Sequence, residues 1–302
     1  MVSANEKRIR FGLRFIRLMM GYMPLQMTRS LMNYPLYRVR LPDQIRTKQV
    51  TVAGVPCEWI TDSERPDGPL VLYLHGGGFV LGASHLHRKM VAHLVTLTGG
   101  RALMVDYRLA PEHPFPAALD DCLAVYKEIL ENNSPQDTVI VGDSAGGNLT
   151  LTTLIAARDA RLPLPAAGVC LSPATDLRLH DEVQWTTVRD ELLHPRAIKM
   201  FRESYIGHGD PDNPLMTPVL ADLRGLPPLL LLAGEPEGLC GDIVNFAEEA
   251  KRQGVPARLH VEPRMWHVWT LNLPELPQAL ATLQDIAAFI GEHARQPVTV
   301  TE

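Results

Sequence analysis

Residues 138–147 read TVIVGDSAGG, and this stretch decides which fold the sequence indicates. The run at residues 138–141 is continuous rather than alternating, as a strand covered on both faces must be, and a helical pattern begins near Ala145. Glycines on both sides of Ser144 allow a sharp bend that a side chain would block. The pattern predicts a serine on a strand-to-helix turn above a sheet, where the helix dipole favours developing negative charge.

Strand and helix patterns alternate on both sides of this turn. Continuous apolar runs predict strands at residues 70–74, 102–105, 138–141, 167–171, 229–232 and 257–261. Helical patterns are predicted at residues 86–97, 117–130, 145–160, 243–253 and 277–294. The alternation predicts an α/β fold with a mostly parallel central sheet and helices on both faces. Antiparallel strands that open the sheet are predicted at residues 39–41, 47–52 and 57–61.

The composition fits a folded, soluble chain. Its 302 residues are 21% charged and 46% hydrophobic, close to the averages of globular proteins, which excludes a disordered, collagenous or disulfide-scaffold protein. A formal net charge of -5 offers no basic field for phosphate backbones, so no nucleic-acid partner is expected.

The N-terminus and the cysteines both predict a cytoplasmic protein without stable membrane insertion. Arg14 and Arg17 interrupt the apolar run at residues 11–27, which leaves fewer than the roughly 20 apolar residues of a spanning helix, and no cleavage site follows. The cysteines lack CxxC or Cys/His ligand spacing, which indicates free thiols and no metal site. They are Cys57, Cys122, Cys170 and Cys240.

The first 45 residues are basic and rich in methionine, and we interpret them as a cap segment. Ile9, Leu13, Ile16 and Met20 recur at helical spacing with arginines between them, which predicts an amphipathic helix with a basic outer face. Plain packing on the core and attachment to a membrane surface are the alternatives. A cap or mobile lid is favoured over an anchor because flexible methionines cluster there.

A second departure from the alternation lies at residues 176–227. This stretch has no clean strand and is too long for an ordinary connection. We predict a helical insertion that completes the cap, within a main domain that spans residues 46–302.

The segment His75-Gly76-Gly77-Gly78 follows the strand predicted at residues 70–74. Three glycines let backbone N–H groups approach a substrate carbonyl and bind the oxyanion that forms on attack by a serine. A flexible connecting loop is the alternative. The phosphate-binding patterns G-x-x-x-x-G-K-[ST] and G-x-G-x-x-G are absent, so the presence of Ser144 favours an oxyanion loop.

These motifs resemble those of the hormone-sensitive-lipase-like family of α/β-hydrolases, also called bacterial lipolytic family IV. The resemblance implies an α/β-hydrolase fold, a carboxylic-ester hydrolase preferring short acyl chains, and a cap built from the N-terminal segment and the insertion. It implies that the backbone N–H groups of Gly77, Gly78 and Ala145 form the oxyanion hole. The matching segments are HGGG at 75–78, DYRLAPEHPFPA at 106–117, GDSAGG at 142–147, residues 234–242 and MWHV at 265–268.

A serine nucleophile needs a base and an acid, which follow it in the order acid and then histidine in this fold. His267 lies just past the strand predicted at residues 257–261, at the end of the sheet where α/β sites assemble, and it matches the family's histidine. The acid comes from GEPEGLCGD at 234–242. Alignment on the family's motif leucine predicts Glu237, with Glu235 as the competitor, whereas Asp242 suits a helix cap.

The resulting prediction is a serine carboxylesterase for short-to-medium acyl esters. Ser144 attacks the ester to form an acyl-enzyme, His267 transfers the proton, and Glu237 orients the imidazole, without a metal or cofactor. An amidase or deacetylase with the same residues is the alternative, and a non-catalytic small-molecule-binding protein is disfavoured by the intact His267. The expected partner is a small-molecule ester, and a homodimer remains open.

Overall fold

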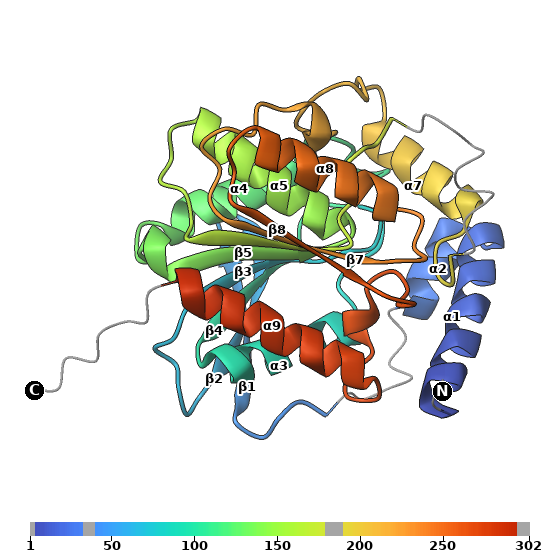
Figure 1. Cartoon of the computed structure of the whole chain (residues 1–302), viewed down its shortest axis with the longest axis horizontal. Helices are drawn as coiled ribbons and strands as arrows, with labels where there is room; N and C mark the ends of the chain where they lie inside the picture. Colours follow the sequence, from blue (N-terminus) through green and yellow to red (C-terminus); the bar gives the residue numbers. More distant parts are fainter. Residues whose placement is uncertain (1–3, 33–39, 179–189, 295–302) are drawn as a thin grey trace, which may run out of the picture.

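An eight-stranded sheet forms the centre of the molecule in the order β1-β2-β4-β3-β5-β6-β7-β8 (Figure 1). The computed structural model describes residues 4–32, 40–178 and 190–294. The pairs β1–β2 and β2–β4 are antiparallel, and the other neighbouring pairs are parallel. The strands are β1 (Ile45–Val52), β2 (Val55–Asp62), β3 (Leu70–Leu74), β4 (Arg101–Val105), β5 (Thr138–Asp143), β6 (Ala167–Leu171), β7 (Leu229–Gly234) and β8 (Ala257–Glu262).

Helices cover both faces of the sheet. They are α3 (His85–Thr98), α4 (Ala117–Ile129), α5 (Ala145–Asp159), α8 (Cys240–Arg252) and α9 (Pro277–His293), with the short 3-10 helices η1 (Pro135–Asp137), η2 (Pro218–Leu220) and η3 (Trp269–Leu271). Figure 1 shows α4, α5 and α8 over one face and α3 and α9 over the other. The predicted α/β architecture, a mostly parallel sheet between helical layers, is confirmed.

The buried strands divide the core into two clusters. Along β5, Ile140 packs with residues of α4, α5 and α8, whereas Val139 and Val141 pack with residues of α3 and α9. Successive side chains of a strand point to opposite faces, so a strand covered on both sides is apolar without alternation. This burial explains the continuous run that the sequence shows before Ser144.

A hairpin opens the sheet as predicted. The strands predicted at residues 47–52 and 57–61 are present as β1 and β2. They are joined by Ala53 and Gly54, whose φ angles are 51° and 79°. Two central residues with positive φ give a turn whose twist matches that of the flanking strands.

The strand predicted at residues 39–41 is wrong for its described part. Arg40 and Leu41 lie in neither helix nor strand, and residue 39 lies outside the described residues. Pro42 has no N–H group to donate to a neighbouring strand, and a turn follows it, so strand pairing begins only at Ile45.

The N-terminal segment forms two helices, α1 (Ala4–Tyr22) and α2 (Leu25–Met32), which lie with α7 (Pro195–Ile206) at one end of the sheet (Figure 1). The predicted apolar stripe is present, because Leu13 and Met20 are buried on α1. Helix α7 belongs to the insertion predicted at residues 176–227, of which residues 179–189 lie outside the described part. Two segments that are far apart in the sequence therefore pack together.

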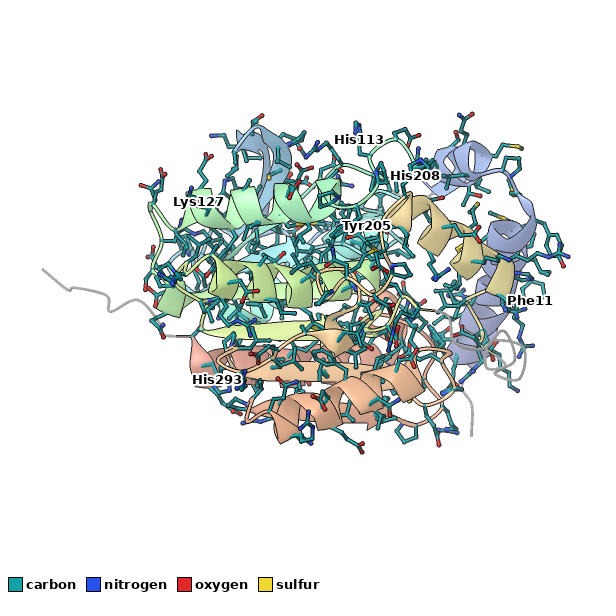
Figure 2. The ribbon with its side chains drawn as sticks, turned by 90° about the horizontal axis from the view of Figure 1, so that it is seen from above. Phe11, His113, Lys127, Tyr205, His208 and His293 are labelled. Carbon is teal, nitrogen blue, oxygen red and sulfur yellow. The ribbon has the colours of Figure 1, made fainter. Side chains whose placement is uncertain are left out.

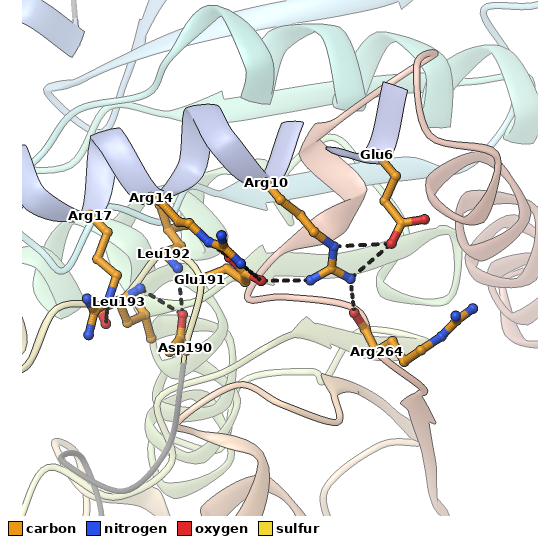
Figure 3. A network of polar contacts seen from close by, with 9 residues as sticks. All are labelled: Glu6, Arg10, Arg14, Arg17, Asp190, Glu191, Leu192, Leu193 and Arg264. Carbon is orange, nitrogen blue, oxygen red and sulfur yellow. Dashed lines mark hydrogen bonds and ion pairs between the residues drawn. The ribbon is translucent and has the colours of Figure 1, made fainter. Parts of the chain in front are cut away.

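The predicted basic outer face of α1 is wrong for three of its arginines. Arg10 and Arg14 bind the carboxylate of Glu191 at 2.9 and 2.8 Å, and Arg17 donates to the carbonyl of Leu193 at 3.1 Å (Figure 3). Guanidinium groups bind carboxylates through strong charge-assisted hydrogen bonds. The arginines therefore turn toward the insertion and join it to α1.

The contact between α1 and Glu191 predicts an acid-sensitive part of the stability. Burial raises the pKa of the Glu191 carboxyl, but hydrogen bonds from Arg14 and Arg10 outweigh burial and lower that pKa below its ordinary value of 4.5. A lowered carboxyl pKa stabilises the fold above pH 4.5, and this contribution is lost as the pH falls through the lowered value.

We expect Glu191→Gln to lower the free energy of unfolding at neutral pH by about 1 kcal/mol, since one charged partner is removed. Acidification should then destabilise the variant less than the wild type. Thermal melting across a pH series measures both effects. The exposed pair Arg258–Glu292 is the control, and Glu292→Gln should change little. Equal acid sensitivity of wild type and Glu191→Gln would contradict this account.

Candidate active site

Ser144 lies on the turn between β5 and α5 in a backbone conformation that few side chains adopt. Its φ is 53° and its ψ is -116°. The turn is possible because its glycines meet other backbone atoms. A Cβ on Gly142 would lie 2.2 Å from the carbonyl oxygen of Gly146, and a Cβ on Gly146 would lie 1.9 Å from that of Leu74. The two glycines are therefore required by close packing of the backbone.

His267 and Glu237 meet Ser144 from two later loops. The Nε2 atom of His267 lies 2.9 Å from Ser144 Oγ, and its Nδ1 atom lies 2.8 Å from Glu237 Oε2. His267 is 3% exposed and Glu237 is 2% exposed. The structure thus brings together the serine, histidine and acid that the sequence predicted.

The carboxylate governs the protonation of this histidine. Burial lowers the pKa of His267, but the hydrogen bond and the negative charge of Glu237 outweigh burial and raise that pKa above 6.5. In the tautomer that suits these contacts, Nδ1–H donates to Glu237 and Nε2 accepts the Ser144 hydroxyl proton. The arrangement provides a serine with an adjacent, oriented base.

The loop after β7 explains why Glu237 rather than Glu235 reaches the histidine. Glu237 Oε1 accepts a hydrogen bond from the backbone N–H of Gly234 at 3.0 Å, which turns the carboxylate inward. Glu235 is exposed and accepts from the N–H of Arg264 at 3.2 Å. Asp242 lies in the first turn of α8, and the N-cap position belongs to Leu239, so Asp242 does not occupy the cap position predicted for it.

The glycine loop after β3 lies beside Ser144. Gly77 and Gly78 have φ angles of 117° and 61° and line the same cavity as Ser144 and His267. A Cβ on Gly78 would lie 2.3 Å from the ring of Phe201. Ala145 is the first residue of α5, so its N–H belongs to the helix N-terminus and needs no partner within the helix. Gly77 and Gly78 thus lie on the same cavity as Ser144, and Ala145 follows the serine directly.

Asp143 holds this loop from behind, a role that the sequence analysis missed. Its Oδ1 accepts from the N–H of Gly76 at 2.9 Å and from the hydroxyl of Tyr73, and its Oδ2 lies 3.3 Å from His87 Nε2. Burial raises the pKa of the Asp143 carboxyl, but the charge of His87 and these hydrogen bonds outweigh it and keep the pKa low. The sequence signal for this role was the position of Asp143 inside the GDSAGG motif.

Asp190 is a second residue that the sequence did not indicate. One carboxylate oxygen accepts from the N–H groups of Leu192 and Leu193, each at 2.8 Å, and the other accepts from the N–H of Gly238 at 2.9 Å. Gly238 directly follows Glu237, so Asp190 joins the insertion to the loop that carries the acid. No local pattern marks such a contact across 48 residues.

A cavity of about 330 Å³ opens above Ser144 and is lined mainly by apolar side chains. Helix α1 and the insertion both contribute to its wall. The contributing residues are Ile9, Gly12, Leu13, Ile16 and Met20 from α1, and Leu192, Leu193, Ile198 and Phe201 from the insertion. The cavity suits a substrate with an apolar portion.

No helix within residues 4–32, 40–178 and 190–294 combines the length and apolar character needed to cross a membrane. In the same ranges, no group of three or more His, Cys, Asp or Glu side chains could hold a metal ion. The four cysteines are free, and burial raises the pKa of the Cys57 thiol to about 12.

Known proteins share this architecture and are similar to this chain in sequence. A family model described as the alpha/beta hydrolase fold matches residues 71–271. An acetyl-hydrolase of Streptomyces hygroscopicus is 39% identical over 80% of this chain and 81% of that protein. An esterase of Acinetobacter venetianus is 32% identical over 81% and 82%. The crystal structure of an esterase from the bacterial hormone-sensitive lipase family superposes with a TM-score of 0.91 and 38% identity, over 97% of this chain and 99% of the other.

The geometry predicts how His267 titrates. In the wild type, His267 should be half protonated above pH 6.5, and Glu237→Gln should move its pKa downward because burial then acts without the neighbouring charge. NMR titration of histidine-labelled protein measures this. Glu235→Gln is the matched control and should leave His267 unchanged. A larger shift in Glu235→Gln would identify Glu235 as the partner.

Proposed function

The chain belongs to the α/β-hydrolase family, among the hormone-sensitive-lipase-like esterases, and we propose that it hydrolyses short-to-medium acyl esters through a serine acyl-enzyme. Its relatives bear the names acetyl-hydrolase, esterase and carboxylesterase, and the chain is a carboxylic-ester hydrolase. The observation that carries the proposed mechanism is the pair of hydrogen bonds that links Glu237 through His267 to Ser144.

In this mechanism Ser144 Oγ attacks the ester carbonyl while His267 Nε2 takes the hydroxyl proton. The carbonyl oxygen becomes an oxyanion that accepts hydrogen bonds from the backbone N–H groups of Gly77, Gly78 and Ala145. His267 then donates its proton to the leaving alcohol. Water then attacks the acyl carbon with His267 again as base, the bond to Ser144 Oγ breaks, and His267 returns the proton to Oγ as the carboxylic acid leaves. Glu237 stabilises the charged imidazole in both steps.

The cap is the second part of the proposal. The proposed cap comprises residues 1–45 and the insertion at 176–227, and its described parts cover the site of the main domain, residues 46–302. Support comes from the cavity wall, to which both segments contribute, and from the ion pairs of Arg10 and Arg14 with Glu191. We also propose a cytoplasmic location, which four free thiols favour.

The size of the cavity supports short-to-medium acyl chains, and Gly12 provides part of its room. A Cβ built on Gly12 meets nothing within 4 Å, although the residue lies in the interior of α1 and lines the cavity. Glycine in a helix interior destabilises it by roughly 0.5–1 kcal/mol relative to alanine. The open space therefore points to a role in admitting substrate.

We expect Ser144→Ala to lower ester turnover by a factor on the order of 10⁶ while the protein stays folded. Reaction with an organophosphate, measured by mass spectrometry, should also be lost. Ser30→Ala, at an exposed position of α2, is the control and should react as the wild type does. Anilides assayed beside esters separate an amidase from an esterase. Normal labelling of Ser144→Ala would refute the assignment of the nucleophile.

For Gly12→Leu we expect a narrower cavity. The ratio of kcat/KM for p-nitrophenyl octanoate to that for p-nitrophenyl acetate should fall by a factor on the order of ten. Gly12→Ala controls for helix propensity and should be slightly more stable than the wild type, with a smaller change in the ratio. An unchanged ratio in Gly12→Leu would show that substrate does not pass this position.

A further inference from the structure

Helix α1 is apolar on two opposite faces. One face lines the cavity above Ser144. On the other, four large side chains recur at helical spacing and face away from the protein: Phe11, Phe15, Leu18 and Tyr22 are 77%, 62%, 54% and 63% exposed. Figure 2 shows Phe11 at the outer edge of the molecule. Large apolar side chains gathered in one exposed row mark an interaction surface, so the row suggests a missing partner.

Helix α2 carries further exposed apolar side chains and lies at the same end of the molecule as α1 (Figure 1). Met27 is 56% exposed and Leu31 is 38% exposed, and both line a surface hollow with Met23. Among the described residues, six of the nine large hydrophobic side chains that are exposed lie on α1 and α2. We name these six residues the outer stripe: Phe11, Phe15, Leu18, Tyr22, Met27 and Leu31.

Basic side chains border the outer stripe. Lys7 precedes the stripe residue Phe11 by four positions and Arg8 precedes it by three, so both lie beside the outer stripe on the helix surface. Both side chains are exposed, whereas Arg14, the next basic residue on this side of α1, is paired with Glu191 at 2.8 Å. The acidic residue of these helices, Glu6, is buried at 4% exposure. This surface is thus positive in a chain with a net charge of -5.

We propose that the outer stripe docks the protein on the surface of an anionic lipid bilayer. A helix with Phe and Leu on one face and Lys and Arg beside them lies in the plane of such an interface without crossing it. A second copy is a poorer fit, because an isologous interface would set the same positive surface against itself.

Docking in this way would place the cavity close to lipid. The two faces of α1 are separated by the width of one helix, roughly 10 Å, so the cavity wall lies about that far from the bound surface. Esters dissolved in the bilayer would then enter beside α1. This consequence for the substrate rests on the proposed esterase mechanism, whereas docking itself does not.

Sedimentation of the full chain with lipid vesicles tests the proposal. We expect binding to vesicles of phosphatidylcholine with phosphatidylglycerol, weaker binding to phosphatidylcholine alone, and loss of binding at high salt. The double variant Phe11→Ser/Phe15→Ser should bind the anionic vesicles at least about tenfold more weakly. Leu280→Ser, at a 40% exposed position of α9, is the control and should bind normally.

A second variant tests the charge without changing the apolar row. Lys7→Gln/Arg8→Gln should weaken binding and reduce its salt dependence. Turnover of a water-soluble ester should stay unchanged in both double variants, which separates loss of docking from failure of the mechanism. Wild type that stays in the supernatant with anionic vesicles would overturn the proposal. So would a dimer in ultracentrifugation that Phe11→Ser/Phe15→Ser abolishes, because the stripe would then bind a second copy.

Discussion

The close approach of backbone atoms around Ser144 is the constraint on which the site depends. The strained turn is held from two neighbouring strands, since Gly146 packs on the carbonyl of Leu74 and the N–H of Ser144 donates to the carbonyl of Leu171 at 2.8 Å. The hydroxyl is thereby aimed at one point above the sheet. Because β7 and β8 follow β6 in the sheet, the loops that carry Glu237 and His267 reach that same point.

Two buried carboxylates stabilise different parts of the site. Glu237 raises the pKa of His267, and Asp143 binds the N–H of Gly76 and so holds the glycine loop. A buried charge is costly unless its oxygens are hydrogen-bonded, and both carboxylates meet this condition through backbone N–H groups. Asp190 uses the same contact with Gly238 to join the insertion to the acid loop. A hydrogen bond therefore links the insertion, which forms part of the cavity wall, to the loop that carries Glu237.

Helix α1 serves three surroundings at once. Its apolar inner face lines the cavity, its arginines bind Glu191 between α1 and the insertion, and its aromatic outer face meets the exterior. These three sets of contacts explain why the segment is both basic and apolar. An ordinary amphipathic helix has one apolar face, whereas α1 has two. The ion pairs account for its attachment to the insertion, and they leave the outer face free for another partner.

The sequence by itself determined the order of strands and helices, the turn at Ser144 and the position of His267 after the last strand. Continuous apolar runs and glycines report on the local backbone, so one sequence suffices to find them. Glu237 and Glu235 lie two residues apart; the alignment on the motif leucine favoured Glu237, but the contact of its carboxylate with His267 is visible only in the tertiary structure. The tertiary structure was also needed to place the arginines of α1 that bind the insertion, and to place Asp190. Their partners lie 48 to 181 residues away, and no local pattern encodes which distant group will neutralise a charge.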